Sequence, residues 1–125
     1  MNPILVKTYV AGGVIAPYSI AKVGAAAGQA LQAAANTDKL LGLVGMLGAA
    51  SGARVDVCHL GIGEVKLGGT VVFGDKITAD EDGAGIALTD QALAAGACES
   101  VGTALSAGAA GDIIPVLIQL QRISA

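Results

Sequence analysis

The chain has 125 residues, enough for one domain that buries roughly two-thirds of the surface exposed by its unfolded form. Its seven basic residues are scattered and its net charge is −3, which disfavours a nucleic-acid partner because phosphate binding needs clustered Lys and Arg. Only 14% of the residues are charged, against about 25% in ordinary domains, and 54% are hydrophobic. A surface this poor in charge favours association with other proteins or with further copies.

No segment predicts a membrane partner. The longest apolar stretch, residues 40–50, is about half the ~20 residues that a helix needs to cross a bilayer. The N-terminus lacks the basic region and apolar core of a signal peptide, so we expect synthesis in the cytoplasm.

Residues 1–8 are expected to form an extended N-terminal arm. Pro3 interrupts regular hydrogen bonding, and the three aliphatic residues after it favour a β conformation without a turn that would pair them locally. Gly12 and Gly13 then separate this segment from the rest of the chain. The expected organisation is therefore an arm followed by one β domain, residues 9–125.

The first half of the β domain contains three candidate strands. Residues 14–23 are β-compatible, although Pro17 confines that strand to an edge or a bulge. The Ala-rich residues 24–35 fit a helix or a strand, and we favour the strand because two glycines weaken a helix there. Residues 40–50 suit a buried strand and its turn, with Leu41, Leu43 and Leu47 on one side.

Period-2 alternation is clearer in the second half. It predicts strands at residues 54–57 and 64–67, separated by a turn at Gly61 and Gly63, and a long final strand at residues 113–123. Residues 89–96 could form a single helical turn. No repeat of fixed period is evident. Short strands about ten residues apart, with Gly turns between them, predict an all-β domain, either a small β-barrel or a jelly-roll-like sandwich.

One local cluster resembles a nucleophile with a base, namely Cys58 and His59 beside Asp56. Adjacent strand residues point to opposite faces, so Cys58 and His59 should not bond to each other, and a nearby carboxylate opposes thiolate formation. Cys58 and Cys98 are expected to be buried structural thiols. We therefore predict no enzymatic activity.

Two further features have plain structural interpretations. The acidic segment at residues 80–83 predicts an exposed hairpin tip, because four adjacent residues cannot supply the six to eight oxygen ligands that calcium prefers. The glycine pairs at residues 12–13 and 68–69 lack the Lys-Ser/Thr of a phosphate-binding loop and are interpreted as turns. No metal or other cofactor is expected.

Turn glycines, aspartates and alternating valines recur in a characteristic order between about residues 7 and 120. The segments are KTYVAGG (7–13), RVDV (54–57) with a following glycine, VKLGGTVVFGD (65–75), Ala79-Asp80 with Gly83, and VGTAL (101–105) with Gly111-Asp112. This order resembles the capsid cement, or head decoration, proteins of tailed bacteriophages. The resemblance implies a non-enzymatic β-barrel or jelly-roll-like protein that binds the outside of an icosahedral head as a dimer or trimer. It also implies that the protein reinforces contacts between major capsid proteins.

The implied location is the capsid surface of the virion, after synthesis in the host cytoplasm. The arm is the candidate interface with the capsid or with another subunit, because an unpaired β segment binds by strand addition. Its residues are Asn2, Pro3, Ile4, Leu5, Val6 and Lys7. The alternative is a small-ligand or carbohydrate-binding β-barrel of a phage tail or receptor-binding apparatus, which the scarcity of aromatic residues disfavours.

Overall fold

The computed structural model describes residues 2–88, 96 and 98–123, and these residues form nine strands and no helix. The predicted all-β fold is therefore confirmed, and no helix among these residues could span a membrane. The expected helical turn at residues 89–96 lies almost entirely outside the described residues. The strands are β1 (Asn2–Ala11), β2 (Ile20–Val23), β3 (Gln29–Gln32), β4 (Leu40–Val44), β5 (Arg54–Lys66), β6 (Lys76–Ala79), β7 (Gly85–Ala87), β8 (Cys98–Ala104) and β9 (Ile113–Ile123).

The first five strands close into a barrel, which we call the N-terminal unit. Their order is β1-β3-β2-β4-β5, and β5 pairs back with β1. The β1–β3 pair is parallel and the other four pairs are antiparallel. Small and β-branched side chains fill the interior of this barrel, namely Ala11, Ile15, Ala21, Ala30, Val44, Val55 and Val57.

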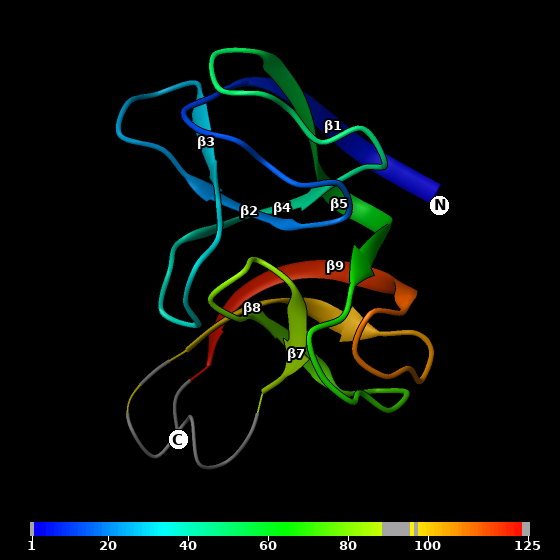
Figure 1. Cartoon of the computed structure of the whole chain (residues 1–125). Coiled ribbons are helices and arrows are strands. Elements are labelled where there is room, and N and C mark those ends of the chain that lie inside the picture. The colour runs from blue at the N-terminus through cyan, green and yellow to red at the C-terminus, as the bar shows by residue number, and fades with distance from the viewer. Residues whose placement is uncertain (1, 89–95, 97, 124–125) are drawn as a thin grey trace.

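The C-terminal unit repeats this arrangement with β5 as its first strand. Its strands follow the order β5-β9-β8-β6-β7, in which each strand number is four higher than in the order β1-β5-β4-β2-β3 of the N-terminal unit. A parallel bridge between Leu67 and Gly85 corresponds to the parallel β1–β3 pair. Figure 1 shows the two units one above the other, with β5 passing between them.

Backbone contacts in the loops confirm that the two units are equivalent. Ile15 and Ala49 exchange two hydrogen bonds in the N-terminal unit, and Val71 and Gly108 exchange two in the C-terminal unit. Val71 lies 56 residues after Ile15, whereas Gly108 lies 59 residues after Ala49. The repeat has no constant spacing, which is why a search for a fixed period does not reveal it.

Strand β5 is continuous over 13 residues, so the expected turn at Gly61 and Gly63 is wrong. Gly61 has a φ of 104°, a conformation that favours glycine, and it pairs with Pro3 on one side and Ile118 on the other. Gly63 is buried where a Cβ would lie 3.0 Å from the Leu43 side chain. The two glycines therefore let one strand serve both units instead of ending it.

A shared core and backbone hydrogen bonds join the two units into one domain. Leu43 and Cys58 of the N-terminal unit pack in the same buried cluster as Val65, Val116 and Ile118 of the C-terminal unit. Across the same boundary, the amides of Ile20, Lys66 and Glu99 donate to the carbonyls of Gly83, Tyr18 and Asn36, respectively.

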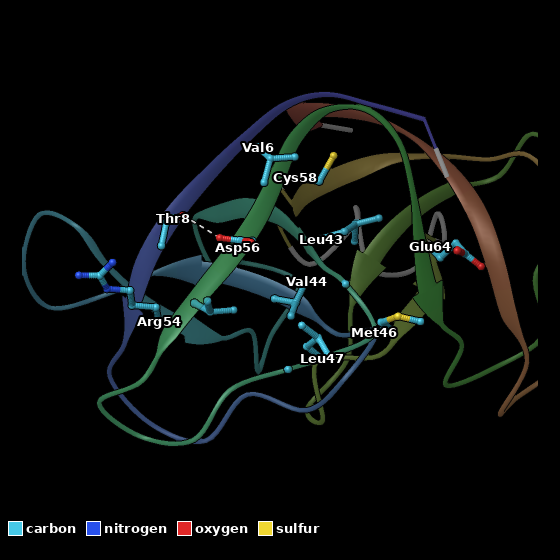
Figure 2. A pocket seen from close by; sticks show the side chains of 13 residues that line it. Val6, Thr8, Leu43, Val44, Met46, Leu47, Arg54, Asp56, Cys58 and Glu64 are labelled. Atoms are coloured by element: carbon cyan, nitrogen blue, oxygen red, sulfur yellow. Dashed lines mark hydrogen bonds between the residues drawn. The ribbon is translucent and has the colours of Figure 1, made fainter.

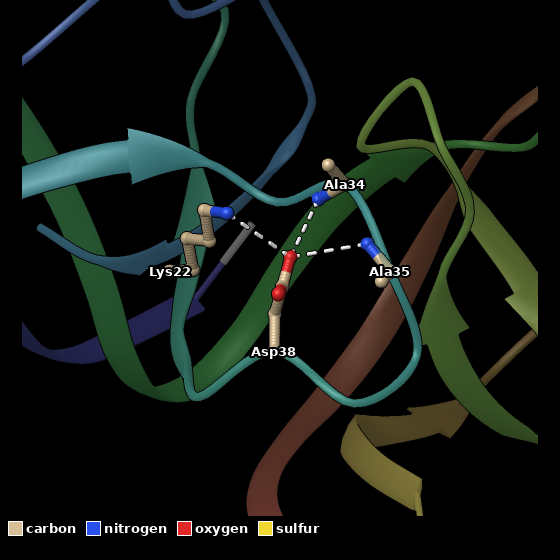
Figure 3. A network of polar contacts seen from close by, with 4 residues as sticks. All are labelled: Lys22, Ala34, Ala35 and Asp38. Atoms are coloured by element: carbon tan, nitrogen blue, oxygen red, sulfur yellow. Dashed lines mark hydrogen bonds and ion pairs between the residues drawn. The ribbon is translucent and has the colours of Figure 1, made fainter.

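The turn between β3 and β4 is organised by one carboxylate, Asp38. Its Oδ2 accepts hydrogen bonds from the amides of Ala34 and Ala35, at 2.8 and 3.0 Å, and lies 3.4 Å from Lys22 Nζ (Figure 3). Because Asn36 in this turn accepts a bond from Glu99, the turn holds the N-terminal unit against β8.

We expect Gly42→Ala to lower the free energy of unfolding by about 1–3 kcal/mol. A Cβ at this position would overlap the carbonyl oxygen of Cys58 on β5, and the equivalent Gly102 meets Leu117 in the same way. The matched control is Gly45→Ala, because a Cβ at Gly45 would have no other atom within 4 Å. Equal midpoints of urea unfolding for the two variants would contradict this packing.

Candidate interaction surface

The candidate interface at the N-terminus lies within β1 and not in a separate arm. The sequence predicts an unpaired arm at residues 1–8, but β1 pairs antiparallel with β5 of the same chain from Asn2↔Ile62 to Val10↔Arg54. The partner strand is about 50 residues away in sequence, so no local pattern reveals it. Ile4, with 81% of its side chain exposed, and its neighbours Leu5, Val6 and Lys7 still face solvent. An interface role for Asn2 to Lys7 stays a prediction.

A groove of about 490 Å³ lies beside this strand in the N-terminal unit. Alternation places Val6 and Thr8 of β1 next to Cys58 and Asp56 of β5 on this side, since these residues are paired in register. The loop after β4 forms another wall (Figure 2). The lining residues are Val6, Thr8, Leu43, Val44, Gly45, Met46, Leu47, Gly48, Arg54, Val55, Asp56, Cys58 and Glu64.

Polar side chains from β1 and β5 border the groove. Thr8 Oγ1 donates to Asp56 Oδ1 at 2.7 Å, the dashed contact in Figure 2. Arg54 lies two positions before Asp56 on the same face of β5 and is exposed. The floor is aliphatic, so the groove combines an apolar surface with a small polar border.

The structure separates the residues of the suspected nucleophile cluster. The Cys58 thiol is buried and donates to the Leu60 carbonyl at 3.2 Å, and burial raises its pKa. His59 Nε2 lies 2.8 Å from the Tyr9 hydroxyl instead. Asp56 is bonded by Thr8, so neither neighbour activates the thiol.

The Tyr9–His59 contact was not foreseen from the sequence. The ring centroids are 5.5 Å apart, and Lys7 Nζ lies 5.3 Å from the centre of the Tyr9 ring. The register between β1 and β5 shifts near His59, because Leu5 pairs with Leu60 and Val6 with Cys58. His59 lies at this register shift, and a bulge of this kind has no local sequence signal of its own.

The acidic segment forms the tip of the β6–β7 hairpin, as expected. Asp80 Oδ1 accepts hydrogen bonds from the amides of Asp82 and Ala84, while Glu81 and Asp82 are exposed. Gln32 Nε2 donates to the Asp82 carbonyl at 2.8 Å, which ties the tip to the N-terminal unit. Within the described part of the chain, no three His, Cys, Asp or Glu side chains are grouped to hold a metal.

Several strongly exposed apolar side chains lie on loops. Leu47 is 88% exposed and Met46 is 65% exposed, so Leu47 does not share the burial of Leu43, which the sequence places on the same side of this segment. β4 ends at Val44, and Leu47 lies in the loop that follows. Phe73 is 73% exposed in a loop of the C-terminal unit. Exposed aliphatic and aromatic side chains of this kind mark surfaces that contact a partner.

The fold is shared with a phage head protein. The chain superposes with a TM-score of 0.69 on the N base of the head fiber gp8.5 of bacteriophage phi29, covering 92% of this chain and 93% of that chain. The two sequences are 19% identical, so the likeness establishes a common fold. No protein-family model and no curated protein matches this sequence.

We expect iodoacetamide to modify Cys58 slowly in the native protein at pH 8. Burial raises the pKa of the thiol, so little reactive thiolate forms, and unfolding in urea should restore the ordinary rate. A Ser51→Cys variant supplies a matched exposed thiol. Mass spectrometry that finds Cys58 modified as fast as this control would contradict the buried position.

Deleting residues 1–7 is expected to abolish cooperative unfolding. The deletion removes five of the eight positions at which β1 pairs with β5, and it opens the edge of the strand shared by both units. Circular dichroism during a urea titration measures the effect, with full-length Ile4→Thr as the control because that side chain is exposed. A truncated protein with an unchanged midpoint would show that β1 is dispensable.

Proposed function

We propose that this protein is a structural component of a phage virion that binds the outer surface of the capsid and reinforces contacts between major capsid proteins. The proposed role needs neither catalysis nor a cofactor. Its partners are the major capsid protein and further copies of the chain.

The observation that carries this proposal is the agreement in fold with the phi29 head fiber base over nearly the whole of both chains. Fold alone does not determine function, so the surface must also fit the proposed role. The low charge content and the exposed apolar residues beside the groove favour contact with a protein partner over exposure to water.

The surface that we assign to the capsid is the groove with its projecting loop. Met46 and Leu47 offer apolar side chains that a partner would cover, and Arg54 and Asp56 offer polar contacts at the border. Buried apolar anchors inside a polar border are the usual anatomy of a protein interface. The exposed β1 side chains Val6 and Thr8 continue this surface.

A ligand-binding barrel of a tail or receptor-binding apparatus is the competing function. The groove volume falls within the range of small-molecule sites, about 300–1,000 Å³. However, its lining contains no aromatic side chain on which a sugar ring could stack. We therefore favour the capsid over a glycan as the partner of this groove.

Leu47→Asp should reduce binding to phage heads at least about tenfold, because it places a charge in an apolar contact. The experiment is co-sedimentation of purified protein with heads of the encoding phage that lack it. The matched control is Ala107→Asp, since Ala107 occupies the equivalent exposed loop of the C-terminal unit. Failure of the wild type to co-sediment, together with binding on a glycan array, would contradict the capsid role.

A further inference from the structure

Strand β1 has an outer edge that β3 covers only at its end. β3 pairs with β1 at Val10 and Ala11, and no described residue pairs with that edge before Val10. The amide of Val10 donates to Gly28 on the β3 side, whereas the amide of Ala11 donates to Ala53 on the β5 side. Backbone groups therefore alternate between the two edges of this strand, as in any regular β-strand.

By this alternation, the amide and carbonyl groups of Thr8 and Val6 point to the outer edge, away from β5. Both residues are exposed, and their neighbours Ile4 and Leu5 are exposed aliphatic residues. An exposed apolar edge of this length readily pairs with a strand of another chain. Lys7 is the single charged residue between residues 2 and 10.

The C-terminal unit shows what covers the equivalent edge. In the N-terminal unit, Val6 of β1 pairs with Cys58 of β5. In the C-terminal unit, Ile62 of β5 pairs in the same way with Leu117 of β9. Val6 and Ile62 therefore occupy equivalent positions in the two units. Ile62 pairs on its other edge with Asn2 of β1, which runs antiparallel. In the C-terminal unit, the outer edge of β5 at Ile62 is therefore covered by an antiparallel strand, and that strand is β1.

We propose that two copies of the protein pair through the outer edges of their β1 strands, antiparallel and related by a two-fold axis at Val6. In this register, Val6 lies opposite Val6 of the second copy, and Lys7 lies opposite Leu5. The register keeps the two lysines from facing each other, which would be unfavourable. The partner surface is the same on both copies, as a two-fold dimer requires.

This contact goes beyond the proposed capsid role, because it uses the backbone edge of β1 and predicts association of the purified protein. Sedimentation equilibrium should show a monomer–dimer equilibrium for the wild type. Val6→Pro should weaken dimerisation at least about tenfold, since it removes the two amide donors of the central Val6 pair. The ladder to β5 is spared because this amide points outward, and proline is tolerated at such edge positions.

The matched control is Val6→Thr, which keeps the amide and the β-branched shape and should dimerise like the wild type. Residue-resolved hydrogen exchange of the wild type provides a second measurement that needs no variant. The amides of Lys7 and Tyr9 should be protected at all concentrations. Those of Val6 and Thr8 should become protected only at concentrations where the dimer forms.

A wild-type protein that stays monomeric, or a dimer in which the Val6 and Thr8 amides exchange freely, would overturn the inference. Dimerisation unaffected by a folded Val6→Pro variant would overturn it as well. If Val6→Pro does not fold, the exchange measurement decides. A dimer that does not bind heads would reject the capsid role alone, whereas a monomer that binds heads would reject only the β1 pairing.

Discussion

The structure depends on β5, the strand that two barrels share. Its first half pairs with β1 and β4 and completes the N-terminal unit. Its second half pairs with β9 and is the first strand of the C-terminal unit. Gly61 pairs with β1 and with β9 at once, and its positive φ is a conformation that favours glycine. Because one strand carries both ladders, the two units cannot separate without loss of their common core.

Sequence patterns predicted the parts of this fold that are local. Alternation placed the strand at residues 113–123 correctly, and the preference for a strand in the Ala-rich segment is confirmed by β3. The expected turn at Gly61 is wrong because the sequence does not distinguish a turn glycine from a glycine with a positive φ inside a strand. The sequence does not reveal the two-unit repeat, because loops of unequal length make the spacing between equivalent residues vary along the chain.

The candidate surface was predicted less well than the fold, for a physical reason. The apolar character of residues 4–6 is visible in sequence, but their pairing with β5 is a contact between distant segments. The groove likewise joins β1, the loop after β4 and β5, which only the closed barrel brings together. Leu47 resembles a core residue in composition, and only the end of β4 at Val44 shows that it is exposed.

We propose that this two-unit domain binds the outside of a phage head with its groove toward the capsid. An electron cryomicroscopy map of heads saturated with the purified protein tests this placement most directly. We expect density for both units outside the capsid shell, with the loop that carries Met46 and Leu47 in contact with the major capsid protein. Heads without added density, or density in which the groove faces solvent, would contradict it.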